Sequence, residues 1–210
     1  MKLYNLDHSP YSTRVRIQIA KGALPVAVEA PPVALRTQEY FERFPLGKIP
    51  VVELDDGSHL SDSWVIMEYL EATNPRGLSP AGALERAHMQ TIARCADTCL
   101  GPSGIFPLFA SVAAPQDAED LLAALATELQ RLERVLNSLG DCSQRSLHLG
   151  DIALAPHIAY ALLLTPIFGQ PDLLQDYPEL GRWWVWVNED TAVAAQLDVM
   201  LNAAKAFFAG

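Results

Sequence analysis

Cysteine is scarce in this sequence, and its spacing excludes two common structural uses. The 210 residues contain three cysteines, Cys95, Cys99 and Cys142, and no C-x-x-C pair. An odd number without that spacing argues against a disulfide framework and indicates a reducing compartment. Cys95 and Cys99 are spaced to share a helix face, but no soft metal ligand beyond His88 accompanies them. We therefore expect small buried thiols and no metal site.

Positive charge is also in short supply. Fifteen lysines and arginines stand against 25 aspartates and glutamates, which leaves a net charge of −10 at pH 7. Such a balance argues against a nucleic-acid-binding protein, whose affinity depends on contacts with phosphates. The N-terminal stretch MKLYNLDHSPY also lacks the apolar run of a signal peptide. We expect a cytoplasmic protein that binds no nucleic acid.

Long uncharged runs are rare too, and one of them raises the question of a membrane span. The stretch GDIALAPHIAYALLLTPIFGQPD has no charged residue between Asp151 and Asp172. Its two internal prolines, its histidine and its acidic flanks argue against a span. A helix that is apolar on every side is typical of the centre of a globular protein. We therefore expect a buried core helix and no association with a membrane.

The first 76 residues are expected to form a mixed sheet covered by helices. Strand-like and helix-like runs alternate here in the order β-α-β-α-β-β-α. Asp56-Gly57 joins two short apolar runs and predicts a hairpin. The first helix is expected to begin at Pro10 and to close at Gly22, and the last to stop at Asn74 before a proline.

The remainder of the chain is expected to be a separate helical domain. A stretch rich in proline and glycine predicts a linker over residues 77–84, and no strand pattern follows it. Leucines recur every three or four residues from Leu121 to Leu139, which predicts one face of a long helix. The run covers fewer than three heptads, so a bundle helix is favoured over a coiled coil. We expect residues 85–210 to form an all-helical bundle.

The stretch HSPYSTRVRI, residues 8–17, combines a helix start with a chemically useful position. Ser9 is a favoured N-cap and Pro10 suits the first helical turn, so capping alone explains the pair. The same geometry places a hydroxyl among unpaired N–H groups at the positive end of a helix dipole. Such a site favours an anion such as a thiolate, and helix N-termini lower the pKa of a thiol. Ser9 would then activate the sulfur of another molecule without being a nucleophile itself.

Two further motifs place polar groups next to strands. In GKIPVVE, Pro50 opens a strand, and a cis bond before it would expose the backbone of Ile49 or Val51 to a ligand that pairs as an added strand. In LSDSWVIMEYL, Asp62 and Ser63 precede a helix, where capping is the ordinary role. The alternative is a second anion site, in which Ser63 binds a carboxylate and Asp62 an ammonium. Those two groups on one carbon describe an amino-acid end, such as a γ-glutamyl group.

Taken together, these segments resemble a known family. SPYSTRVRI, FPLGKIPVVELDDG, LSDSWVIMEYL and GDIALAPHIAY are similar to the successive motifs of cytosolic glutathione transferases, and the resemblance covers essentially the whole chain. It implies a thioredoxin-like α/β domain followed by an all-helical domain with a pocket for an apolar electrophile, a homodimer, and glutathione as co-substrate. It also implies roles for single residues. Ser9 would activate glutathione, Pro50 would be a cis-proline, and Val51 would pair with the cysteinyl part through its backbone. Asp62 and Ser63 would hold the γ-glutamyl end, and Lys48 would bind the glycyl carboxylate.

Several alternatives stay open beside that resemblance. Other classes of the family use a tyrosine, which makes Tyr4 and Tyr11 rivals to Ser9. A glutathione-dependent isomerase of zeta type has a similar serine before RVRI, but with a Ser-Cys pair where this chain has Pro-Tyr. A non-catalytic regulator, stringent starvation protein A, shares the scaffold. The family's helix-capping motif starts with Ser or Thr, whereas this chain has His148 three residues before Asp151. We expect a cap weaker by about 1 kcal/mol if no other group replaces the oxygen bond.

Overall fold

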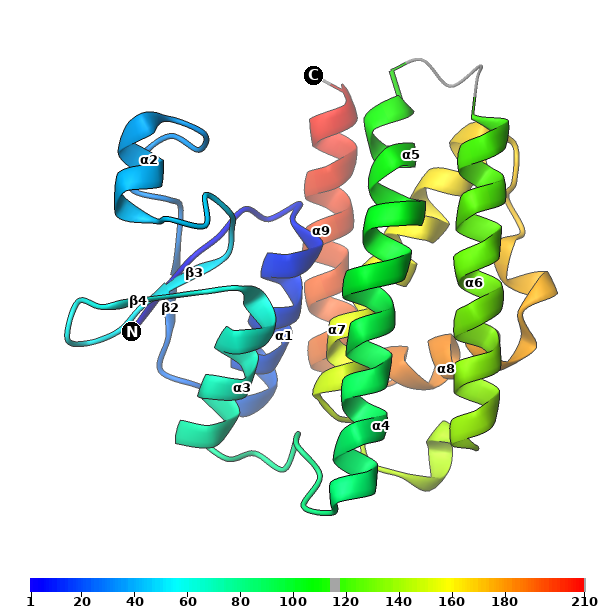
Figure 1. Cartoon of the computed structure of the whole chain (residues 1–210), viewed down its shortest axis with the longest axis horizontal. Helices are drawn as coiled ribbons and strands as arrows, with labels where there is room; N and C mark the ends of the chain where they lie inside the picture. The colour runs from blue at the N-terminus through cyan, green and yellow to red at the C-terminus, as the bar shows by residue number, and fades with distance from the viewer. Residues whose placement is uncertain (114–117, 210) are drawn as a thin grey trace. The chain divides into compact units, whose positions relative to one another are not determined.

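The computed structural model describes residues 1–113 and 118–209, drawn in colour in Figure 1. The chain divides into two compact units: Met1–Gly77 together with Ala195–Gly210, and Leu78–Ala194. The first unit contains β1 (Lys2–Tyr4), α1 (Pro10–Gly22), β2 (Ala27–Glu29), α2 (Gln38–Arg43), β3 (Val51–Glu53), β4 (His59–Ser61) and α3 (Ser63–Thr73), in the order expected from the sequence.

The division into units differs from the expected one at two places. The helix residues from Ala195 onward group with the first unit, although the sequence pattern places them in the second. One reason is Gln196, whose Oε1 accepts a hydrogen bond from Arg16 Nε at 3.0 Å. Leu78, within the expected linker, groups with the second unit, and the N–H of Leu149 donates to its carbonyl at 2.9 Å.

The sheet of the first unit has the strand order β2-β1-β3-β4. β1 runs parallel to β2 and antiparallel to β3, and β3 and β4 form the expected hairpin. Tyr4 and Val51, which pair across β1 and β3, pack with Tyr40 and Phe44 from the segment around α2. The alternate residues of these strands are fully buried as well, so both sheet faces are covered. This arrangement confirms the thioredoxin-like fold.

The first helix begins as predicted and ends differently. Ser9 is its N-cap and Pro10 its first residue. Its C-terminal cap is Ala23, with a φ of 46° in the left-handed region, rather than Gly22. Gly22 remains helical and is packed closely: a Cβ on it would lie 3.0 Å from two side-chain carbons of Leu24. The glycine therefore serves close packing, and the neighbouring alanine takes the left-handed turn that glycine usually supplies.

The described residues of the second unit form no strand. They form α4 (Ala83–Arg94), a π-helical segment (Cys95–Ile105), α5 (Phe106–Ser111), α6 (Glu119–Leu139), α7 (Leu149–Leu164), α8 (Pro178–Asn188) and short 3-10 turns at Cys142–Gln144, Thr165–Phe168 and Leu173–Asp176; α9 (Thr191–Ala209) starts here and continues in the first unit. α4 and α6 run side by side in this unit (Figure 1). The four central leucines of the predicted α6 face are buried, which confirms the bundle helix.

The long uncharged run is the centre of the second unit, as predicted. Fourteen of the 16 residues of α7 are buried. Among the described residues, Leu149–Phe168 is the one helical stretch long and apolar enough to cross a membrane, and most of it is buried inside the protein. An apolar surface that packs against other helices on every side is the signature of a core helix.

The cap at the start of α7 is more complete than the sequence suggests. His148 Nδ1 accepts a hydrogen bond from the N–H of Asp151 at 3.3 Å, and Asp151 Oδ2 accepts from the N–H of His148 at 3.0 Å. An imidazole nitrogen thus replaces the missing hydroxyl in a reciprocal capping box. The lost oxygen bond is thus replaced, because a histidine ring nitrogen is also an acceptor when it carries no proton, and the condition for the expected weakening is not met.

Replacing His148 with alanine is expected to lower the free energy of unfolding by about 1 kcal/mol, since the N–H of Asp151 then loses its acceptor. Urea denaturation of wild type and variant measures the loss. His148→Ser is the matched control, because serine is a favoured cap and should recover most of the stability. Equal stability of the alanine variant and wild type would show that the imidazole does not cap the helix.

Candidate functional site

Ser9 lies at the point where the loop after β1 enters α1. Its side chain is buried, with 8% of the residue exposed. Its Oγ accepts a hydrogen bond from the N–H of Ser12 at 3.2 Å, which confirms the capping role. A hydroxyl that accepts in this way still has its own O–H to donate. Capping and donation to an incoming anion are therefore compatible at this residue.

Three segments that carry predicted site residues leave the sheet at the same end. Tyr4 ends β1, Val51 begins β3 and Ser61 ends β4, and these three residues are aligned in register across the sheet. The loop to Ser9 starts after the first of them, the proline turn precedes the second, and Asp62 follows the third. The strand pairing therefore brings the three motifs to one end of the sheet, although they are far apart in the chain.

The proline turn has the conformation that the resemblance implies. The peptide bond between Ile49 and Pro50 is cis. Val51 lies in a strand flanked by β1 on one side and β4 on the other, so its backbone groups face those strands. A third strand has no place there, which argues against Val51 and for half-buried Ile49 as the residue whose backbone meets a ligand. Lys48 is exposed, and its carbonyl accepts from the hydroxyl of Tyr40 at 2.9 Å.

Asp62 and Ser63 form the start of α3. Asp62 is exposed and has a φ of 68°, in a region of backbone conformation that is uncommon outside glycine. Its Oδ1 accepts from the N–H of Trp64 at 2.8 Å. Ser63 is 3% exposed, and its Oγ accepts from Nε of the fully buried Arg14 at 2.9 Å and from Nη2 of the same guanidinium. The Ser63 oxygen therefore accepts hydrogen bonds from the guanidinium, and its own O–H remains able to donate to a ligand.

The contact between Arg14 and Ser63 was not among the sequence-based predictions. The two residues are 49 positions apart, and it joins the first turns of α1 to the start of α3. The signal available in the sequence is the RVR pattern within an otherwise buried helix. A buried arginine always needs acceptors, but its partner cannot be read from helical periodicity.

The side chains of the two rival tyrosines, Tyr4 and Tyr11, both contact other side chains of the protein. The hydroxyl of Tyr4 donates to Glu53 Oε2 at 2.7 Å. Burial and the neighbouring Glu53 carboxylate raise the pKa of Tyr4, which keeps its proton on the phenol and directed at Glu53. The ring of Tyr11 packs under the Arg14 guanidinium, 4.9 Å from its centroid. These contacts favour Ser9 over Tyr4 as the hydroxyl that meets an incoming thiol.

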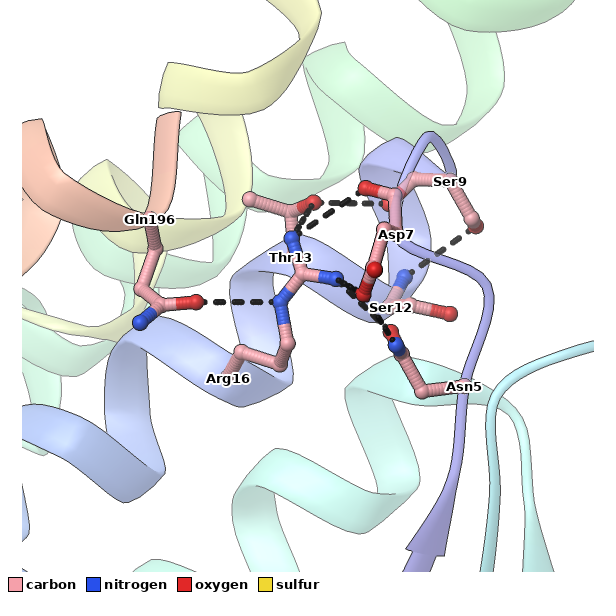
Figure 2. Close-up of polar contacts among 7 residues, drawn as sticks. All are labelled: Asn5, Asp7, Ser9, Ser12, Thr13, Arg16 and Gln196. Atoms are coloured by element: carbon pink, nitrogen blue, oxygen red, sulfur yellow. Dashed lines mark hydrogen bonds and ion pairs between the residues drawn. The ribbon is translucent and has the colours of Figure 1, made fainter. Parts of the chain in front are cut away.

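The loop that carries Ser9 is held by one buried arginine (Figure 2). Arg16, 5% exposed, directs all five of its N–H donors to acceptors. Nη1 donates to the side-chain oxygens of Asn5 and Asp7, both at 2.9 Å. Nη2 donates to the Asp7 carbonyl at 3.2 Å and to Thr13 Oγ1 at 2.9 Å, and Nε donates to Gln196. The sequence motif contained this residue, but its role was not predicted.

The cysteines do not form a metal site in the part of the chain that the structure describes. Cys95, Cys99 and Cys142 are free thiols and each is half-buried, whereas Cys95 and Cys99 were expected to be buried. Burial raises the pKa of Cys95 and of Cys142, which makes both poor thiolates at neutral pH. Over residues 1–113 and 118–209, no group of three His, Cys, Asp or Glu side chains could hold a metal ion.

Comparison with known proteins connects this geometry to one family. A family model described as "Glutathione S-transferase, N-terminal domain" matches residues 8–73. Glutathione S-transferase omega-2 of Mus musculus is 26% identical over 221 residues, covering 100% of this chain and 82% of the relative. Probable maleylacetoacetate isomerase 1 of Drosophila melanogaster is 29% identical over 192 residues, covering 85% and 77%. The crystal structure of a glutathione S-transferase from Methylobacillus flagellatus with glutathione bound has a TM-score of 0.66 at 27% identity and covers 93% of this chain and 98% of that one.

Proposed function

Since this chain belongs to the cytosolic glutathione S-transferase family, we propose that it transfers glutathione to an electrophilic small molecule and that Ser9 stabilises the glutathione thiolate. The observation that supports this most is the meeting of three motifs at one end of the sheet, where Tyr4, Val51 and Ser61 are in register. A serine hydroxyl at a helix N-terminus is thereby placed on the same side as a cis-proline turn and a polar helix start.

Each part of glutathione has a candidate partner at this end of the sheet. The backbone of Ile49, before the cis-proline, is available to pair with the cysteinyl residue. Ser63, backed by Arg14, donates to the carboxylate of the γ-glutamyl end, and exposed Asp62 pairs with its ammonium. Lys48 is an exposed cation suited to the glycyl carboxylate.

The proposed reaction is a nucleophilic attack by sulfur on carbon. The thiol proton leaves to solvent, and the thiolate is held by the Ser9 hydroxyl and by the N-terminal N–H groups of α1. A C–S bond then forms while the leaving group departs with its electron pair, or, in an addition, the electrophile takes up a proton. The protein contributes orientation and electrostatic stabilisation, with no covalent enzyme intermediate. We place the enzyme in the cytoplasm as a homodimer, in keeping with the family.

Titration of the thiolate absorbance of bound glutathione tests this proposal. A free cysteine thiol has a pKa of about 8.5, and a helix N-terminus with a hydroxyl donor should lower it. The absorbance is expected to appear at a lower pH with the protein than without it. If the protein binds no glutathione, the proposal fails and a non-catalytic role on the same fold takes its place.

Replacing Asp62 with asparagine is expected to weaken glutathione binding by up to about fivefold, because an exposed ion pair contributes about 1 kcal/mol or less. Asparagine tolerates a positive φ and keeps an oxygen for the N–H of Trp64, so the change removes the charge and little else. The KM for glutathione measures the effect.

Asp56→Asn is the matched control for the Asp62 variant. Asp56 is also exposed, and it accepts from the N–H of Ser58 two residues on at 2.9 Å, in the same geometry but in the hairpin turn. Its variant should leave the KM unchanged. An equal KM in the Asp62 and Asp56 variants would remove Asp62 from the glutathione site.

A glutathione-dependent isomerase is the second candidate, and the similarity to the Drosophila isomerase favours it. In such a reaction glutathione adds to a double bond, the bond rotates, and glutathione leaves again. The presence of Pro10 and Tyr11 in place of the Ser-Cys pair argues against it. Product analysis distinguishes the two, because a transferase consumes glutathione into a stable conjugate and an isomerase returns it.

A further inference from the structure

Arg16 connects two segments that lie 180 residues apart in the chain. Its Nε donates to Oε1 of Gln196 in α9, and its Nη2 donates to two groups of the Ser9 region (Figure 2). We propose that Arg16 is a positioning residue for Ser9, and that Gln196 makes the C-terminal helix part of the thiolate-activating site. This inference rests on the proposed function of Ser9.

The hydrogen bonds from Arg16 reach Ser9 through one intermediate side chain. Nη2 donates to Thr13 Oγ1 at 2.9 Å, and the hydroxyl of Thr13 donates to the carbonyl of Ser9 at 2.8 Å. The same nitrogen donates to the carbonyl of Asp7 at 3.2 Å. The backbone is therefore held on both sides of His8, and with it the direction of the Ser9 side chain. A site that acts by a single hydroxyl loses efficiency when that hydroxyl is loosely held.

Gln196 controls the orientation of the guanidinium rather than its charge. The glutamine is neutral, and it is the acceptor for Nε, while the other four donors point to the loop and to α1. Burial lowers the pKa of Arg16 and the Asp7 carboxylate raises it, and an arginine keeps its charge at neutral pH in either case. Removing the glutamine leaves a buried donor without its acceptor, which favours rotation of the whole group.

A second contact of the same helix adjoins Ser9. The ring of Phe207 stacks on the imidazole of His8, with ring centroids 4.9 Å apart and planes inclined by 22°. His8 immediately precedes Ser9. The C-terminal helix therefore contacts Arg16 of α1 near its own start and His8, in the loop before Ser9, near its own end, and all four residues belong to the first unit.

The test compares Gln196→Ala, Thr13→Val and Arg16→Lys with wild type and with Ser9→Ala. In Gln196→Ala and Thr13→Val, the pKa of the bound glutathione thiol is expected to rise. The thiolate fraction at neutral pH and kcat should each fall by about threefold to tenfold, while the KM for glutathione stays within about twofold of wild type. Arg16→Lys should do more, because lysine cannot reach five acceptors at once. Amide hydrogen exchange at Ser12, whose N–H donates to Ser9 Oγ, should become faster in all three variants.

Two matched controls separate positioning from a general loss of packing. Asn202 is exposed on the same helix, and Asn202→Ala should behave as wild type. Thr73 makes the same kind of hydroxyl bond as Thr13, to the carbonyl of Tyr69 four residues earlier at 2.8 Å, but at the far end of α3. Thr73→Val should change neither the pKa of bound glutathione nor the exchange at Ser12. Thermal unfolding identifies any variant that fails to fold.

The outcomes distinguish this inference from the proposed function. If Ser9→Ala raises the pKa of bound glutathione but Gln196→Ala and Thr13→Val do not, the positioning role is overturned and the function of Ser9 stands. If Ser9→Ala itself has no effect on that pKa, the proposed activation fails. In that case, hydrogen exchange of the Ser12 amide is the measurement that tests the positioning role. Faster exchange in the Gln196 and Thr13 variants supports the role, and unchanged exchange overturns it.

Discussion

Replacing Ser9 with alanine is expected to lower turnover with glutathione and an activated aryl chloride well over tenfold, while the affinity for glutathione stays nearly unchanged. The hydroxyl is proposed to donate to the thiolate and to no other part of glutathione. A thiol pKa raised by two units corresponds to about 2.7 kcal/mol of lost thiolate stabilisation. Steady-state kinetics and the ultraviolet titration of bound glutathione measure the two effects on the same samples.

The Ser9 variant also loses a helix cap, and the control must account for that. Thr37 caps α2 with a hydroxyl that accepts from the N–H of Tyr40 at 3.2 Å, the same distance as the bond between Ser9 and Ser12. Thr37→Ala should cost a similar amount of stability, about 1 kcal/mol, with turnover largely retained. Ser9→Thr keeps a hydroxyl and should recover part of the activity. Wild-type turnover in Ser9→Ala would reduce Ser9 to a helix cap.

The second large effect is expected on folding, at Asp151. This carboxylate is fully buried and accepts from Arg145 Nη1 at 2.6 Å, Arg145 Nη2 at 2.8 Å, Trp183 Nε1 at 2.9 Å and the N–H of His148 at 3.0 Å. Asp151→Ala leaves two buried N–H groups without that acceptor and removes the carboxylate partner of Arg145, whose side chain is partly buried. The free energy of unfolding should fall by about 3–5 kcal/mol, measured by chemical denaturation. Asp141→Ala is the control: this exposed aspartate accepts from Ser143 N at 2.9 Å and should cost about 1 kcal/mol or less.

The same carboxylate makes stability depend on pH in acid. Burial by itself would raise the pKa of Asp151, but the hydrogen bonds and the charge of Arg145 oppose it, and the pKa is held well below its usual range. A group with a depressed pKa in the folded state contributes its full stability above its unfolded pKa, about 3.9, and loses it as the pH falls toward the folded value. Wild type should therefore lose stability below about pH 4 more steeply than Asp151→Asn. Parallel stability curves for the two proteins would contradict the role of the carboxylate.

Local patterns in the sequence were sufficient for many of the helices and turns. The turn chemistry of Asp56-Gly57 predicts the hairpin between β3 and β4, because few residue pairs suit that turn. Ser9 followed by proline predicts the start of α1, because capping depends on neighbours within three residues. The buried leucines of α6 follow in the same way from helical periodicity. In each case the interaction partners are close in the chain.

Contacts between distant segments required the folded chain. Arg16 meets Gln196 across 180 residues, and Arg14 meets Ser63 across 49. No periodicity relates such pairs, because the packing of whole elements selects the partner of a buried side chain. The order of the elements and the residues of the candidate site were thus encoded locally. Strand pairing brings the three motifs to one end of the sheet, and the packing of the C-terminal helix supplies Gln196, which accepts a hydrogen bond from Arg16.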